Sequence, residues 1–159
     1  MGIALFFSVY IHWLVLVIAP LAVARLAANA LDGLVARRTG LARPWGEVFN
    51  ECCDRLADIL VFVGLAFNLL VNATLVWGTL VCILFNSYLG TVSKAAGGKR
   101  QFGGLLAKAD RMIYMALFSY VVFFYGGIAW NWLLLAFIPA TLFTIVQRAS
   151  WTYRDLKRD

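Results

Sequence analysis

The chain has 159 residues, of which 63% are hydrophobic and 14% are charged. A soluble domain has about 45–50% apolar and about 25% charged residues, so this composition excludes both a soluble globular domain and a disordered chain. Lysine and arginine outnumber the acidic residues by 14 to 8, but they lie between apolar runs and form no single solvated patch, so nucleic acid is not an expected partner.

Five apolar segments follow one another along the chain. They cover Ile3–Ala24, continuing as helix-forming sequence to Arg37; a run from Glu47 that is fully apolar over Ile59–Val71; and Leu75–Val92, Met112–Tyr125 and Trp132–Val146. A helix needs about 20 residues to cross the hydrocarbon core of a bilayer. The sequence therefore predicts an all-α integral membrane protein, a polytopic bundle of about five transmembrane helices that forms a single domain over residues 1–159.

The basic residues between these segments lie on one side of the predicted bundle. They occupy the connections 37–45 and 93–111 and the tail after Gln147, whereas the turns 72–74 and 126–131 contain none. By the positive-inside rule this side is cytoplasmic, which predicts a multi-pass inner (cytoplasmic) membrane protein whose C-terminus faces the cytoplasm. Five spans then leave the N-terminus outside without a basic flank, so we expect an N-terminal helix to be missing or supplied by another chain.

Acidic residues concentrate where the first two predicted helices meet. Five of the eight lie within a window of 30 residues: Asp32, Glu47, Glu51, Asp54 and Asp58. At about 100° per residue, the four acids of the second helix share one stripe with Asn50, and Asp32 shares a face of the first helix with Asn29. The short link through Pro44 makes the helices antiparallel neighbours, so we expect these polar faces to meet near the cytoplasmic interface.

Such a carboxylate cluster predicts divalent cations. Like charges raise one another's pKa, so the group cannot fully ionise without added positive charge. Oxygen donors suit Mg²⁺ or Mn²⁺, and two such ions beside arginine and lysine suit a pyrophosphate-containing substrate. The alternative interpretation is a structural network of carboxylates and arginines between the helices.

The same residues resemble a family signature. The pattern Asn29-x2-Asp32-Gly33-x2-Ala36-Arg37-x8-Gly46-x3-Asn50-x3-Asp54 is similar to that of the CDP-alcohol phosphatidyltransferases, which have Asp at the positions of Asn29 and Asn50. The chain looks like a variant bacterial branch of this family. The resemblance implies a membrane enzyme, usually of six helices and often a homodimer. Such enzymes transfer a phosphatidyl group, or a related phosphoalcohol, from a CDP-linked donor such as CDP-diacylglycerol to an alcohol, and release CMP in phospholipid biosynthesis.

The resemblance also implies a role for each site residue. Asp54 would be the general base, and small residues would leave room for the cytidine nucleotide. The expected nucleotide- and phosphate-binding residues are Gly33, Ala36, Arg37, Gly46, Lys108 and Arg111. Because two signature aspartates are asparagine, we expect a rearranged metal site in which Glu51 and Asp58 restore the lost charge. The expected ligands of two Mg²⁺ or Mn²⁺ ions are Asn29, Asp32, Asn50, Glu51, Asp54 and Asp58.

Other interpretations stay open at this point. Lys108 and Arg111 open the fourth helix as candidate phosphate ligands, with Asp110 placed to orient one of them, but they could equally be headgroup anchors. The chain could also be a catalytically impaired family member that binds nucleotide or lipid, or that partners an active homologue. A transporter is disfavoured, because its acidic residues should lie near the middle of the membrane. The sequence does not identify the acceptor alcohol.

Overall fold

Helices make up the regular structure of the protein. A computed structural model describes residues 1–38 and 43–157. Its elements are α1 (Gly2–Phe7), the 3₁₀ helix η1 (His12–Val17), α2 (Ile18–Arg38), α3 (Pro44–Ala66), α4 (Ala73–Ala95), α5 (Lys108–Tyr125), the 3₁₀ helix η2 (Gly127–Ala129) and α6 (Trp130–Leu156). These described residues include no strand, and the all-α prediction is confirmed.

Three helical segments of the described chain are long and apolar enough to cross a membrane. They are His12–Val35, Ala73–Ala95 and Gly127–Leu156. α3 and α5 form close to two of the predicted spans, but both contain several charged residues in their first half, and they are not among these three. The chain is thus a helical membrane protein, and its five spans stay a prediction.

The first apolar run is interrupted, so the expectation of continuous helix from Ile3 to Arg37 is wrong. The chain leaves α1 at Phe7 and becomes helical again only at His12. The Ser8 hydroxyl and the Asn68 side-chain amide both donate to the Leu5 carbonyl, at 2.7 and 3.0 Å. The end of α1 is therefore satisfied both by the residue that follows it and by a residue from a distant part of the chain. Hydropathy does not reveal this break, because the residues on both sides of it are equally apolar.

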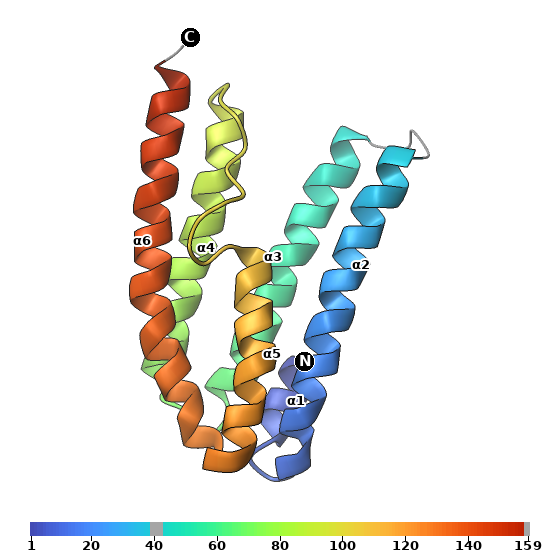
Figure 1. Ribbon diagram of the computed structural model, residues 1–159, viewed down its shortest axis with the longest axis vertical. Helices are drawn as coiled ribbons and strands as arrows, with labels where there is room; N and C mark the ends of the chain where they lie inside the picture. The colour runs from blue at the N-terminus through green and yellow to red at the C-terminus, as the bar shows by residue number, and fades with distance from the viewer. Residues whose placement is uncertain (39–42, 158–159) are drawn as a thin grey trace.

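Toward one end of the bundle, α4 and α6 separate from α2 and α3 (Figure 1). α4 packs along α6, α2 packs against α5, and α3 contacts α1 and α4. At the closed end, Asn72 caps α4 by accepting from the Thr74 N–H at 2.9 Å, and its own N–H donates to Asn131 at 2.8 Å. From the open end, the segment between α4 and α5, residues 96–107, runs back beside α4 to the start of α5 (Figure 1).

Candidate active site

A cavity of about 910 Å³ lies between α2 and α3. The two helices pack against different neighbours, so their polar faces border a space instead of closing on each other. The cavity is lined by every motif residue whose side chain is described: Asn29, Asp32, Gly33, Gly46, Asn50 and Asp54. The side chains of Ala36 and Arg37 lie outside the described residues.

Asp58 has a different environment from the other acidic residues of α3. Its side chain is fully buried, and its two oxygens accept from Arg25 of α2 at 2.8 Å and from Arg111 of α5 at 3.0 Å. Arg55 adds a more distant ion pair at 3.9 Å. Arg25 also reaches the backbone carbonyl of Asp54 at 3.4 Å, and so joins α2 to α3 beside the cavity. With both oxygens engaged, Asp58 acts here as the structural alternative predicts, as the centre of an interhelical ion-pair network.

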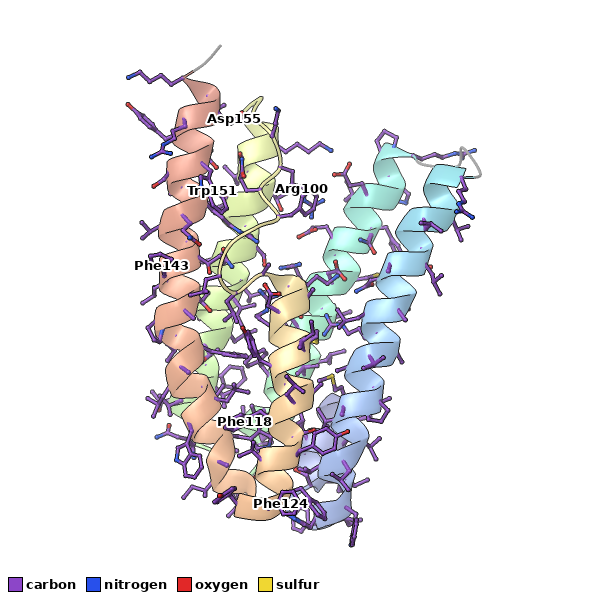
Figure 2. All side chains as sticks on the ribbon, in the orientation of Figure 1. Arg100, Phe118, Phe124, Phe143, Trp151 and Asp155 are labelled. Carbon is purple, nitrogen blue, oxygen red and sulfur yellow. The ribbon has the colours of Figure 1, made fainter. Side chains whose placement is uncertain are left out.

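The other carboxylates of α3 are paired with cations from the α4–α5 side of the molecule. Asp54 forms an ion pair with Lys108, and Glu51 forms one with Arg100. Glu47, near the start of α3, binds Lys94 at 2.6 Å and Arg100 at 3.2 Å. In Figure 2, Arg100 extends from the α4–α5 segment toward α3. The predicted stripe of acids is therefore neutralised by the chain's own basic residues.

These pairings bear on the predicted metal site. Within residues 1–38 and 43–157, no three Asp, Glu, His or Cys side chains are grouped closely enough to hold a metal ion. The side chains of Asn29, Asp32, Asn50 and Asp54 nevertheless line one cavity, and their oxygens match the donors that Mg²⁺ and Mn²⁺ prefer. These oxygen donors fit Mg²⁺ or Mn²⁺ in chemical type. For Asp54 to bind such an ion, its ion pair with Lys108 must first break.

A second cavity of about 630 Å³ adjoins the first. Four residues line both cavities: Asn29, Glu47, Asn50 and Asp54. The second one is also lined by five basic residues: Arg55, Arg100, Lys108, Arg111 and Arg148. Arg55 and Arg111 are among these lining residues, and each has a buried side-chain N–H group without a hydrogen-bond partner. The charge of the lining favours an anion in this cavity.

Sequence reasoning predicted only part of this basic set. It singled out Lys108 and Arg111, whereas Arg100 was counted with the loop and Arg148 with the C-terminal tail. The available signal for Arg148 was its position at the end of an apolar helical run, where a buried arginine usually has a defined partner. Nothing in the spacing of the sequence distinguished Arg100 from its basic neighbour Lys99.

Arg148 lines the second cavity but uses its donors to hold backbone. Its Nε donates to the Gly103 carbonyl at 2.8 Å, and its two terminal nitrogens donate to the carbonyls of Phe102 at 2.9 Å and Asn86 at 2.8 Å. Gly90 permits this docking, because a Cβ there would lie 2.6 Å from the Gln101 carbonyl oxygen. Arg148 therefore fixes the α4–α5 segment against α4 and α6.

Asp110 does not orient Lys108 or Arg111, and that expectation is wrong. Its Oδ2 accepts from the backbone N–H of Ala107 at 3.0 Å. A carboxylate in the first turn of a helix satisfies backbone N–H groups that have no partner within the helix. Asp110 thus helps to terminate the α4–α5 segment and to start α5.

Comparison with known proteins finds relatives but no matching protein-family model. The chain is 32% identical over 111 residues to the inner membrane protein YnbA of Escherichia coli, covering 69% of this chain and 55% of that protein. It is 33% identical over 132 residues to the phosphatidylinositol phosphate synthase of Mycobacteroides abscessus, covering 76% and 57%. It is 30% identical over 91 residues to the archaetidylinositol phosphate synthase of Pyrococcus horikoshii, covering 57% and 48%. The chain spans about half the length of these curated relatives.

Proposed function

We propose that the chain belongs to the CDP-alcohol phosphatidyltransferases, and that it transfers a phosphatidyl group or a related phosphoalcohol from a CDP-linked donor, such as CDP-diacylglycerol, to an alcohol with release of CMP. The observation that carries this proposal is the position of the motif, because its described residues from α2 and α3 line one cavity. Relatives named as synthases of phosphatidylinositol phosphate and archaetidylinositol phosphate support the family and a role in phospholipid synthesis. The basic end of the bundle is assigned to the cytoplasm by the positive-inside rule, and the relative named as an inner membrane protein supports that membrane.

The donor nucleotide is assigned to the first cavity. Gly33 and Gly46 contribute no side chain to its wall, and no atom lies within 4 Å of where a Cβ on Gly46 would be. Asn29, Asp32, Asn50 and Asp54 would hold Mg²⁺ or Mn²⁺ here, with Glu51 beside them. Such ions, when bound, would neutralise the pyrophosphate and stabilise the departing CMP. Asp58 keeps its ion pairs with Arg25 and Arg111, and through them it holds α3 against α2 and α5.

Asp54 is proposed as the general base because it lines both cavities. The acceptor hydroxyl would lie within hydrogen-bond reach of its carboxylate, which takes the proton. The hydroxyl oxygen forms a bond to the phosphorus that bears the lipid, and the bond from this phosphorus to the CMP oxygen breaks. Lys108 must leave Asp54 before this carboxylate can serve either a metal ion or the acceptor.

The acceptor is proposed to be an alcohol that itself carries a phosphate group. The second cavity is basic, and Arg111, one of its lining residues, has a buried Nε without a hydrogen-bond partner. A buried cationic donor without a partner is unfavourable, so an anion that binds it gains more than at a solvated surface. The named products of the synthase relatives, which are phosphate-bearing inositol lipids, agree with such an acceptor.

The test measures CMP release by the purified full chain with CDP-diacylglycerol and Mn²⁺. We expect inositol phosphate or glycerol phosphate to serve as acceptor better than the corresponding alcohol without phosphate. Asp54→Asn should lower the rate about 100-fold or more. The matched control is Asp155→Asn, which is the same change near the C-terminus and leaves an oxygen to accept from the Lys99 N–H.

Two results would contradict parts of this proposal. CMP release that survives Asp54→Asn would refute the role of this residue as base. If the wild-type chain released no CMP with any acceptor but still bound CDP or lipid, the result would favour the impaired family member. The asparagines at two signature positions are the observation that keeps this second function under test.

A further inference from the structure

Two basic side chains occupy the carboxylates that the proposed reaction needs. Lys108 pairs with Asp54, and Arg100 pairs with Glu51. All four side chains are largely removed from solvent, with exposed fractions of 28% and 9% for the first pair and 19% and 17% for the second. Ion pairs that are partly buried are screened less than surface pairs, so these contacts influence what else the carboxylates can bind.

The backbone that carries Arg100 is firmly anchored. The Ser93 hydroxyl donates to the Lys99 carbonyl at 2.8 Å, and Arg148 donates to the Phe102 carbonyl at 2.9 Å. The Thr144 hydroxyl accepts from the Leu106 N–H at 2.9 Å, close before α5 begins. Since the main chain is held on α4 and α6, the parts that can move are the long side chains of Arg100 and Lys108.

The side chains of Arg100 and Lys108 also line the second cavity, which has other basic residues in its lining. Arg55 and Arg111 line the same cavity, and each has a buried N–H group that has no hydrogen-bond partner. Arg100 and Lys108 can therefore interact with two kinds of negative charge. One is the carboxylates of α3, and the other is an anion bound in the second cavity. They cannot fully neutralise both at the same time.

We propose that Arg100 and Lys108 are exchangeable counter-ions, which neutralise Glu51 and Asp54 until a divalent cation binds and then turn to the anionic group of the acceptor. The inference rests on the proposed function, from which it takes the metal ion and the phosphate-bearing acceptor. It adds a role for Arg100 and a coupling between the two cavities.

Charge balance gives the sign of this coupling. In these two ion pairs, two carboxylates face two basic side chains. The pairs belong to a wider network, because Glu51 also pairs with Arg55 at 3.3 Å and Arg100 also pairs with Glu47 at 3.2 Å. A divalent cation on Glu51 and Asp54 adds two positive charges and weakens the attraction of these carboxylates for Arg100 and Lys108. A doubly charged phosphate or sulfate in the second cavity offsets the added charge. Cation and anion must then strengthen each other's binding by the same factor, because coupling between two sites is reciprocal.

The test titrates Mn²⁺ into the purified full chain in detergent and measures free Mn²⁺ by its electron paramagnetic resonance signal, with and without inorganic sulfate. Arg100→Gln should bind Mn²⁺ roughly five-fold or more tightly without sulfate, because the competing cation is gone. Sulfate should tighten Mn²⁺ binding to the wild type but have little effect on Arg100→Gln. Lys108→Gln should behave like Arg100→Gln, and it provides the test if that variant fails to fold.

Lys99→Gln is the matched control. It removes the same charge from the adjacent residue, whose side chain is exposed, and it should behave like the wild type. If the wild type binds Mn²⁺ and all three variants bind it equally well, counter-ion exchange is refuted while the metal site stands. If the wild type binds no Mn²⁺, the metal part of the proposed function fails and this inference fails with it.

Discussion

Asp58 offers a sharp test of how the bundle is held together. Its carboxylate is fully buried between Arg25 and Arg111, at 2.8 and 3.0 Å, and Arg111 is itself 1% exposed. Asp58→Asn keeps the shape of the side chain and leaves these guanidinium groups without their counter-charge. Removing one partner of a buried ion pair costs about 3–5 kcal/mol. At about 2–4 °C per kcal/mol for a chain of this size, Tm should fall by roughly 6–20 °C.

The assay is thermal unfolding in detergent, followed by tryptophan fluorescence. The reference variant is Glu47→Gln, because Glu47 is 44% exposed and its partners Lys94 and Arg100 are 53% and 19% exposed. Pairs of an exposed carboxylate contribute about 0–1 kcal/mol each, so the loss of two should lower this Tm by no more than about 8 °C and by less than Asp58→Asn does. An equal Tm for the two variants would refute the structural role of Asp58. Unchanged stability with lost Mn²⁺ binding would instead make Asp58 a metal ligand, as the sequence suggested.

Two further predictions test the docked segment and the first cavity. Gly90→Ala places a Cβ 2.6 Å from a carbonyl oxygen of the α4–α5 segment, so it should destabilise the protein by about 1–3 kcal/mol and speed tryptic cleavage of that segment. Gly78→Ala, in the same helix with its nearest atom at 4.0 Å, should do neither, and equal effects would show that the close contact is unimportant. CDP should slow maleimide labelling of Cys53, which is exposed and lines the first cavity, in a variant that keeps this cysteine alone. A variant that keeps only Cys52, which is exposed but lies outside that lining, should label at the same rate with or without CDP, and equal protection of both would argue against nucleotide in this cavity.

The apolar runs predicted most of the helices, because a helix satisfies its own backbone within a bilayer. The structure has helices over Ala73–Ala95 and Lys108–Tyr125, close to the predicted runs. The break after Phe7 could not be predicted in this way. One of the two side chains that satisfy the end of α1 there is Asn68, which is far away in the sequence.

The spacing of the motif predicted which residues of α2 and α3 share the first cavity, because helical periodicity fixes the face of each residue. It could not predict the partner of each acid. Asp54 and Asp58 are one turn apart, yet the first lines both cavities and the second is enclosed by arginines. The difference comes from Arg25 and Arg111, whose positions depend on how α2 and α5 pack against α3. The different environments of Asp54 and Asp58 therefore come from tertiary packing. The spacing of residues along one helix does not encode this packing.

The few side chains common to the two cavities have a stereochemical consequence. Because Asn50 and Asp54 border both spaces, the proposed donor in one and the proposed acceptor in the other would lie on either side of the same two side chains. Direct attack across that boundary inverts the configuration at phosphorus. A route through a phosphorylated side chain needs two successive displacements and restores the original handedness. The chirality of an isotopically labelled product thus records whether both substrates were present together.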